Sequence, residues 1–371
     1  MPKSDDLISN LGFGCMRFPV SSDGLIDEDQ SLEMLNYAYD NGVNYYDTAY
    51  PYHGGNSEPL VGKFISSHPR QSILLATKMP CWLIKEKADM GKYLDEQLKK
   101  LQTEYIDYYL LHALNSRSWL NMKKLKVLSF LEEAQKAGKI RHIGFSFHDG
   151  YKVFKKIVDS YDWTFCQIQF NYLDTHYQAG LKGYELAIKR SMGVIAMEPL
   201  RGGKLVHPVP TEIHKIWQKH KPGIGMVEHA LNWVWDHDGI STILSGMSDL
   251  QQLKENLALS SKAQANSLSL EDHKLYAKIR RTYLKRIAVL CSGCRYCLPC
   301  PSGVAIPDCF GMYNEGIMFD DKSRATKEYN MFIPESAQAG KCSKCGICVS
   351  KCPQNIDIPG EMQKVLDYFG K

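Results

Sequence analysis

The chain has 371 residues, of which 44% are hydrophobic and 23% charged. This is close to average globular composition, so global disorder and fibrous repeats are excluded. The 45 lysines and arginines barely exceed the 41 aspartates and glutamates, and this balance argues against a nucleic-acid-binding protein.

The N-terminal residues contain no basic stretch followed by an apolar run, and no uninterrupted apolar segment approaches the roughly 20 residues that cross a bilayer. We therefore expect a cytoplasmic protein with no membrane partner. Twelve cysteines are unusual for such a chain, and nine of them lie in residues 291–371. In a reducing compartment, clustered cysteines are more often metal ligands or redox groups than disulfides.

Short β-rich runs recur along the first 250 residues and start 24 to 47 residues apart, which leaves room for a crossover helix each time. Eight such units predict an α/β fold, a closed (β/α)8 TIM barrel. An open Rossmann-type sheet is the alternative, but the first turn, Gly12 to Arg17, lacks the third glycine of the dinucleotide fingerprint. The predicted strands are 11–15, 43–47, 73–78, 106–112, 141–146, 165–170, 193–198 and 240–245.

Glycines mark the ends of several predicted helices. A glycine just before a strand can take the left-handed conformation that ends a helix without steric cost. We predict this role at four sites, Asn41-Gly42, Ala137-Gly138, Met192-Gly193 and Asp238-Gly239.

Polar residues stand at the C-terminal ends of the predicted strands, where the chemistry of such barrels gathers. Each of them singly has a structural explanation, but together they bring an acid, a phenol, an amine and an imidazole to one face of a barrel. These residues are Asp47, Tyr52, Lys78, His112, Ser146, Gln167 and Glu198.

Eight stretches carry a family resemblance in matching order over about residues 8–260: LGFGCMR, NYYDTAYPYHGGNSE, ATKMP, DYYLLHAL, KIRHIGFSFH, QIQFNYLD, EPLRGGKL and LKENL. The chain resembles the aldo/keto reductases. The resemblance implies hydride transfer between NADP or NAD and a small carbonyl or alcohol substrate, with Asp47, Tyr52, Lys78 and His112 as the catalytic tetrad. It also implies that the nicotinamide cofactor is held by Ser146, Gln167, Met197, Pro199, Leu200, Arg201, Gly246, Glu255 and Asn256.

The tetrad suggests how a hydride would be moved. Reduction of a carbonyl develops negative charge on oxygen, and Tyr52 is the expected proton donor. A free phenol titrates near pH 10, so its anion needs about 4 kcal/mol of stabilisation at neutral pH. We expect the Lys78 ammonium, at about 4 Å, to supply it, with Asp47 orienting Lys78. A neutral His112 would donate a hydrogen bond to the substrate carbonyl.

The chain departs from the family pattern at several positions. Many members have Ser-Asn where residues 146–148 read Ser-Phe-His, and an aromatic residue on the nicotinamide where Met197 stands. Many members carry a lysine and an arginine that bind the 2′-phosphate. The matching positions here look like Gly246 and Gln252, so the choice between NADPH and NADH stays open. Two nearby basic residues could compensate, Arg201 and Lys204. Three aromatic residues near strand ends line a substrate pocket or serve as packing: Trp82, Trp119 and Phe147.

The cysteine-rich part contains two related runs. The second run, C-x2-C-x2-C-x3-C-P, has the spacing of a bacterial ferredoxin. The runs end alike, in CPSGVAIP and CPQNIDIP, which favours two [4Fe-4S] clusters related by pseudo-symmetry; zinc is the competing assignment. The ferredoxin rule joins Cys291, Cys294 and Cys297 with Cys352, and Cys342, Cys345 and Cys348 with Cys300.

We therefore predict three parts: a reductase-like barrel over 1–260, a helical connector over 261–290, and a small α-rich ferredoxin-like iron–sulfur domain over 291–371. The connector pairs an apolar stripe with a basic face that is either solvated or meets an acidic electron carrier. The clusters would serve electron transfer, with a ferredoxin-like carrier as partner, or structure. The alternatives are a ferredoxin-linked reductase fed by the clusters and a redox-sensing binding protein on a reductase fold.

Overall fold

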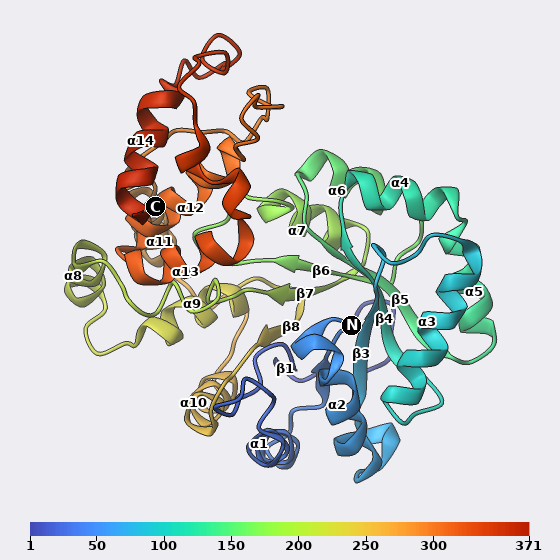
Figure 1. Cartoon of the computed structure of the whole chain (residues 1–371). Helices are drawn as coiled ribbons and strands as arrows, with labels where there is room; N and C mark the ends of the chain where they lie inside the picture. Colours follow the sequence, from blue (N-terminus) through green and yellow to red (C-terminus); the bar gives the residue numbers. More distant parts are fainter. Residues whose placement is uncertain (371) are drawn as a thin grey trace. The chain divides into compact units, whose positions relative to one another are not determined.

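The computed structural model describes residues 1–370, and its eight strands form a closed parallel barrel in chain order (Figure 1). The predicted TIM barrel is confirmed, and every predicted strand is present within two residues at its start. The strands are β1 (Leu11–Gly14), β2 (Tyr45–Asp47), β3 (Leu74–Met79), β4 (Ile106–Leu114), β5 (Ile140–Phe147), β6 (Phe165–Gln169), β7 (Gly193–Met197) and β8 (Ile240–Ser245).

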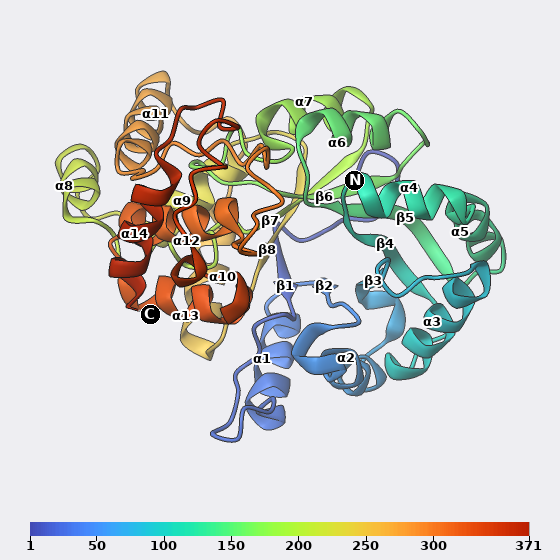
Figure 2. The ribbon, with the colours of Figure 1, turned by 45° about the horizontal axis from the view of Figure 1, so that its top comes forward.

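Helices surround the strands on the outside of the barrel, as Figure 2 shows from a second direction. Their apolar faces pack on the sheet, which leaves polar residues towards solvent. The helices of the barrel unit are α1 (Glu28–Asp40), α2 (Ser57–Ser66), α3 (Lys87–Lys100), α4 (Ser116–Lys124), α5 (Val127–Lys136), α6 (Tyr151–Val158), α7 (Gly180–Lys189), α9 (Met226–Trp235) and α10 (Leu250–Ser260), with the short turns η1 (Tyr52–Gly55) and η2 (Arg70–Ser72).

The helix-ending glycines are confirmed at three of the four predicted sites. Gly42, Gly138 and Gly239 have φ of 86°, 73° and 89°, the left-handed region that glycine enters without a Cβ clash. The prediction at Gly193 is wrong, because Ser191 takes the left-handed conformation there, with φ of 53°. Gly193 begins β7 instead, and a Cβ on it would lie 2.4 Å from the Met1 side chain. Close approach, not helix termination, requires that glycine.

The N-terminal segment packs against the interior of the barrel. Met1 and Ile8 contact the buried cluster that includes Tyr45, Tyr108 and Phe165. The Asp6 carboxylate accepts a hydrogen bond from the Tyr108 hydroxyl at 2.6 Å and lies 3.1 Å from the ring nitrogen Nε2 of His142. This segment therefore covers the end of the barrel at which the strands begin.

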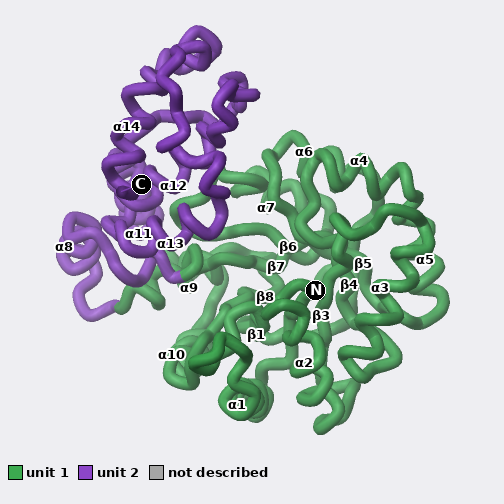
Figure 3. The backbone as a smooth tube through the Cα atoms, viewed as in Figure 1, with its two compact units in different colours: residues 1–202, 225–268 green, residues 203–224, 269–371 purple. Residues whose placement is uncertain are grey.

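The described residues divide into two compact units, shown in Figure 3. The first is residues 1–202 and 225–268, and the second is 203–224 and 269–371. The second unit contains α8 (Thr211–His220), α11 (Leu270–Lys285), α12 (Ile306–Phe319), α13 (Lys322–Phe332), α14 (Ile358–Phe369) and the turns η3 (Glu335–Ala337) and η4 (Ala339–Lys341).

The second unit thus includes a segment from the middle of the chain, which the boundaries predicted at 260 and 290 do not anticipate. The reason is packing of α8 on α11. The Trp217 and Tyr276 rings meet edge to face with centroids 5.1 Å apart, and Lys221 Nζ lies 2.6 Å from Asp272 Oδ1. None of the helices within residues 1–370 combines the length and apolar character that a bilayer crossing requires.

Candidate active site

Lys78 lies at the centre of a polar cluster at the C-terminal end of the barrel. Its side chain is 1% exposed and comes from β3, beside β2, which carries Asp47. Its ammonium donates to Asp47 Oδ1 at 2.6 Å, to the Thr48 carbonyl oxygen at 2.8 Å and to the Tyr52 hydroxyl at 3.4 Å. These three bonds account for all three donors of an ammonium.

Burial and charge act against each other in this cluster. Burial alone would lower the pKa of Lys78, but the Asp47 carboxylate and the Tyr52 phenol raise it, and the pKa lies above its ordinary value. Burial raises the pKa of Asp47, an effect that Lys78 opposes. A buried ammonium next to a carboxylate keeps its proton because losing it would leave a buried charge unpaired.

The expectation that Lys78 makes the Tyr52 phenol more acidic is not met in the free protein. Burial raises the pKa of Tyr52, Lys78 lowers it, Asp47 raises it, and the net direction is upward from 10. Burying the Tyr52 anion costs more free energy than its attraction to the Lys78 ammonium recovers, because that ammonium also interacts with Asp47. Tyr52 is therefore a protonated phenol, the form that can donate a proton.

His112, from β4, faces Tyr52 across the barrel mouth. The two rings meet edge to face with centroids 6.1 Å apart, and the half-exposed Trp82 ring lies 5.1 Å from the imidazole on its other side. Burial lowers the pKa of His112 well below 6.5, and Lys78 and His148 lower it further. The imidazole is therefore neutral and can donate one hydrogen bond.

Of the three aromatic residues considered for the pocket, only Trp82 lies beside the tetrad. Trp119 is buried within α4 and Phe147 is the last residue of β5, fully buried against Phe145 and Phe154. These two are packing residues.

A buried hydrogen-bond network, which no sequence motif marks, lies behind Lys78. The Gln97 amide donates to Glu58 Oε1 at 2.6 Å and to the Lys78 carbonyl oxygen at 3.0 Å, and accepts from the Tyr109 hydroxyl at 2.8 Å. Thr77 also donates to Glu58 Oε1, at 2.8 Å. The network fixes the backbone of β3 at Lys78. Only the fold brings α2, α3 and β4 together, so no local signal marks it.

Three buried polar atoms at the barrel mouth lack a hydrogen-bond partner among residues 1–370: Asp47 Oδ2, His112 Nδ1 and Gln167 Oε1. They come from the last residue of β2, from near the end of β4 and from the middle of β6. Buried polar atoms are almost always paired in folded proteins. Unpaired buried atoms also occur elsewhere in the described residues, but the grouping of these three beside Lys78 fits a site for a polar ligand.

The predicted cofactor residues follow the later strands of the barrel. Ser146 is buried in β5, where its hydroxyl oxygen accepts from the Ala113 N–H at 2.7 Å and keeps its own proton to donate. Asn256 is buried in α10 and donates to the Ser245 hydroxyl at 3.0 Å. The others lie within β6, at or after the ends of β7 and β8, or on α10: Gln167, Met197, Pro199, Leu200, Arg201, Gly246 and Glu255.

The two basic residues considered for a 2′-phosphate are both engaged. Arg201 Nε donates to Asp174 Oδ2 at 2.9 Å. Lys204 belongs to the second unit and bonds Glu315 at 3.1 Å and Glu328 at 2.7 Å.

Arg17 lies beside Gly246, the position for which the sequence comparison expected a lysine. A Cβ on Gly246 would lie 2.9 to 3.2 Å from the side-chain carbons of Arg17, so the Arg17 stem crosses the space that a longer side chain would need. The Arg17 guanidinium lies 3.8 Å from Glu198 and is 44% exposed. No local signal marks Arg17, because 229 positions separate it from Gly246 in the chain and only closure of the barrel between β1 and β8 joins them.

The cysteines of the second unit line two separate pockets. One contains Cys291, Cys294, Cys297 and Cys352, and the other contains Cys300, Cys342, Cys345 and Cys348. Each pocket thus takes three cysteines from one run and the fourth from the other. Ile306 lines both pockets, and the remaining walls are mainly apolar.

The donor set of each pocket fits a [4Fe-4S] cluster, which takes one thiolate on each of four irons. Within the described residues, no three His, Cys, Asp or Glu side chains converge closely enough for a single metal ion. Burial, and then the neighbouring Cys342, Cys300 and Cys345 thiols, raise the pKa of Cys348. Both halves of the CPSGVAIP and CPQNIDIP repeat lead into a helix that begins Ile-Pro, α12 at Ile306 and α14 at Ile358.

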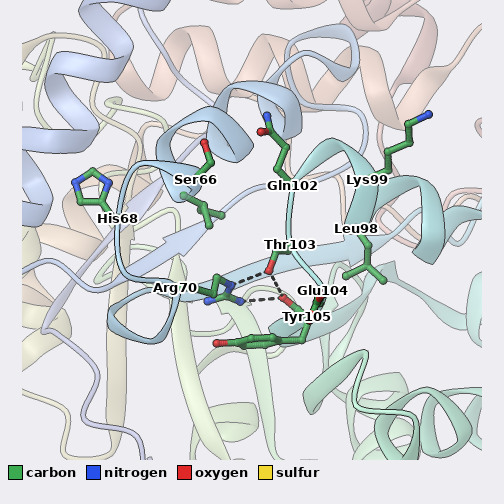
Figure 4. Close-up of a pocket in the computed structure, with 10 residues that line it drawn as sticks. Ser66, His68, Arg70, Leu98, Lys99, Gln102, Thr103, Glu104 and Tyr105 are labelled. Atoms are coloured by element: carbon green, nitrogen blue, oxygen red, sulfur yellow. Dashed lines mark hydrogen bonds between the residues drawn. The ribbon is translucent and has the colours of Figure 1, made fainter.

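A further pocket of about 690 Å³ lies at the opposite end of the barrel, among residues that precede β3 and β4 (Figure 4). Arg70 is its most prominent cation, but its donors are committed to Thr103 at 2.8 Å, to the Tyr105 carbonyl oxygen at 2.9 Å and to Asp107 at 2.5 Å. No residue predicted for the site lines this pocket.

Two protein-family models match the chain. A model described as "Aldo/keto reductase family" matches residues 10–275, and one described as "4Fe-4S dicluster domain" matches residues 290–356. The uncharacterized oxidoreductase YqkF of Bacillus subtilis is 26% identical over 300 residues, covering 73% of this chain and 92% of the relative. The L-galactose dehydrogenase of Arabidopsis thaliana is 28% identical over 276 residues, covering 68% and 84%. The solved structure of aldo-keto reductase AKR11C1 from Bacillus halodurans (holo form) superposes with a TM-score of 0.63 at 27% identity, covering 74% of this chain and 93% of that chain.

Proposed function

The chain belongs to the aldo/keto reductase family and carries a C-terminal 4Fe-4S dicluster domain, and on this premise we propose that it transfers hydride between NADPH or NADH and a small carbonyl or alcohol substrate. The observation that carries the proposal is the buried Lys78 ammonium, held between Asp47 and Tyr52 at the barrel mouth. Burying an ion pair costs desolvation free energy that the attraction between its charges does not always offset, so stability alone does not explain this arrangement. Acid catalysis at Tyr52 accounts for it.

Each member of the tetrad has a distinct part in the reaction. When bound, a reduced nicotinamide would supply a hydride, with its electron pair, to the carbonyl carbon. The carbonyl oxygen then takes the Tyr52 proton, so that carbonyl, hydride and proton together become an alcohol. Lys78 stabilises the phenolate that remains, and Asp47 keeps Lys78 charged and in place. The neutral His112 donates a hydrogen bond to the same oxygen before and during the transfer.

The cofactor would lie across the ends of β5 to β8. The orphaned Gln167 Oε1 and the hydroxyl proton of Ser146 offer an acceptor and a donor, the pair that a carboxamide requires. Met197 would contact the nicotinamide ring, and Pro199, Leu200, Arg201, Gly246, Glu255 and Asn256 the rest of the dinucleotide.

We further propose that the two cysteine pockets hold two [4Fe-4S] clusters. Cys291, Cys294, Cys297 and Cys352 would hold one, and Cys300, Cys342, Cys345 and Cys348 the other. Such a cluster exchanges one electron at a time, and we propose electron transfer as its role. A ferredoxin-like carrier would then be a partner of the second unit.

The test of the hydride-transfer proposal is Tyr52→Phe. Loss of the proton donor should lower kcat for carbonyl reduction by at least about 100-fold, while the dissociation constants of NADPH and NADH, followed by fluorescence titration, stay within about twofold. Turnover of a panel of small aldehydes and ketones by the wild-type chain supplies the reference rate.

Tyr50→Phe is the matched control. Tyr50 lies two residues away, and its hydroxyl donates to Glu96 at 3.2 Å outside the tetrad. This variant should keep the wild-type rate. Unchanged turnover in Tyr52→Phe, or failure of the wild-type chain to bind either nucleotide, would refute the proposal.

A further inference from the structure

The two cysteine runs expose their ligands in the same pattern. In each run the second cysteine, Cys294 or Cys345, is exposed, whereas the third, Cys297 or Cys348, is only 9% exposed. A cluster held in either pocket would therefore lie closest to solvent at the second cysteine. Electron exchange between proteins requires such an approachable edge.

Large apolar side chains surround these exposed cysteines. Tyr296 and Ile347, at matching positions two residues after each of them, are 66% and 48% exposed, and Val349 is 37% exposed. Single exposed apolar residues are common on protein surfaces, whereas these recur at the same position of each cysteine run.

The two runs themselves carry only positive charges. Residues 341–356, which hold the second run, include three lysines and no acidic residue. Lys344 and Lys351 are exposed, and Lys341 lies 3.8 Å from Glu335. In the first run, residues 290–303, Arg295 is the one charged residue. It pairs with Asp308 of α12 at 2.8 Å, which leaves Lys344 and Lys351 as the cations of the two runs that form no ion pair within residues 1–370. Each oxidised cluster with four thiolates carries about −2, and the lysines oppose that charge at the surface.

The two runs lie side by side within the second unit. The Ser302 and Ser343 hydroxyls are 2.8 Å apart, which ties the end of the first run to the start of the second. Ile306 lines both pockets. We call the surface formed by the two joined runs, with their exposed cysteines, apolar residues and lysines, the cysteine face.

We propose that the cysteine face is the docking site for an acidic one-electron carrier protein. The proposal rests on the proposed pair of [4Fe-4S] clusters and assigns the partner to this face and not to the basic side of α11. In each encounter the reduced carrier would lose one electron and the docked chain would gain one. Lysines at the rim of an apolar patch fit an acidic partner, because opposite charge speeds encounter and the apolar centre holds the complex.

The experiment uses the full chain with its clusters assembled anaerobically. Cluster reduction by a pre-reduced acidic plant-type ferredoxin is followed by stopped-flow absorbance at several salt concentrations. The wild-type second-order rate constant should fall as salt rises. Lys344→Glu with Lys351→Glu should lower it by about tenfold or more at low salt, and Tyr296→Ser with Ile347→Ser should lower it without altering its salt dependence.

Lys215→Glu with Lys219→Glu is the matched control, since these lysines are exposed on α8 of the same unit, apart from the cysteine runs in Figures 1 and 2. It should keep the wild-type rate, and dithionite should reduce all the proteins equally fast. Equal ferredoxin rates in the wild type and Lys344→Glu with Lys351→Glu would overturn the docking proposal, as would reduction by dithionite but not by ferredoxin. Absence of iron and sulfide would refute the clusters first, and the docking site with them.

Discussion

At the scale of single residues, the site fixes the protonation states of three titratable side chains, Lys78, His112 and Tyr52. Lys78 keeps its proton because of Asp47, His112 loses its proton because it is buried beside that ammonium, and Tyr52 keeps its proton because burial outweighs the ammonium. Each side chain therefore has one protonation state across the neutral range. For carbonyl reduction these are the required states, an acid at Tyr52 and a neutral donor at His112.

The pH profile of reduction follows from these directions. Reduction needs a protonated Tyr52, whose pKa is raised above 10, so kcat should stay level between about pH 7 and about pH 9 and decline only at higher pH. His112 should add no step in this range, because its pKa is lowered well below 6.5. The measurement is kcat against pH at saturating cofactor and substrate. A fall of about tenfold within that range would show that another group donates the proton.

Arg17 is the residue we expect to meet the cofactor phosphates, since its stem lies over Gly246. Arg17→Ala should weaken nucleotide binding by about tenfold or more, the value of one charged hydrogen bond. Equilibrium titration with both nucleotides locates the contact. A larger loss for NADPH places Arg17 at the 2′-phosphate, and an equal loss places it at the pyrophosphate. Arg281 is exposed on α11, and the control variant Arg281→Ala should bind both nucleotides as the wild type does. Unchanged affinities in Arg17→Ala would contradict the assignment.

At the scale of elements, the N-terminal segment closes the barrel by polar bonds as well as by apolar packing. The Asp6 carboxylate gathers the Tyr108 and Ser4 hydroxyls and the His142 ring. Burial raises the pKa of Asp6, but these bonds lower it more, and the net direction is downward from 3.8. The ionised form is therefore stabilised in the folded state.

Asp6→Asn should lower the free energy of unfolding by about 1 kcal/mol at neutral pH, a modest value because the carboxylate is one-quarter exposed. A carboxylate whose pKa is lower in the folded state stabilises the fold at pH values above its unfolded pKa. This stabilisation is lost as pH falls through the folded pKa. The difference from the wild type should therefore begin to fall near pH 3.8 and vanish only at lower pH, once Asp6 is protonated in the folded state. Urea unfolding at two pH values measures it, with exposed Asp5→Asn as control. Equal destabilisation at both pH values would contradict a role for the charge.

At the scale of the whole molecule, the second unit joins parts of the chain that are far apart in sequence. Residues 203–224 leave the barrel between β7 and α9 and pack with α11 through Trp217 and Tyr276. Within that unit, each cysteine pocket takes its fourth cysteine from the other run, and Ile306 lines both pockets.

Paired cysteine substitutions test that exchange. With crossed ligands, Cys291→Ser with Cys352→Ser damages one cluster and should leave about four irons per chain, whereas Cys291→Ser with Cys300→Ser damages both and should leave about none. The opposite result would show that each run holds its own cluster. Iron and sulfide analysis of anaerobically purified protein gives the count. Cys309→Ser, a buried thiol outside both pockets, should keep about eight irons.

Short-range features of the sequence determined most of the architecture. Eight β-rich runs, spaced for crossover helices, placed every strand, and three glycines ended helices where left-handed backbone was needed. The cysteine spacing and the Ile-Pro repeat predicted two related sites. These features depend on neighbouring residues alone, because backbone sterics, strand periodicity and ligand reach act over a few positions.

Only the tertiary structure decided the rest. The raised pKa of Tyr52, the neutrality of His112 and the engagement of Lys204 by Glu315 depend on burial and on partners far along the chain. The same holds for Gly193 beneath Met1 and for Arg17 over Gly246. Desolvation and Coulomb interactions are set by distances in space, and closing a barrel brings its first and last strands together. The residues alone therefore indicated which groups gather at the mouth of this barrel, and the fold determined the charge that each one carries there.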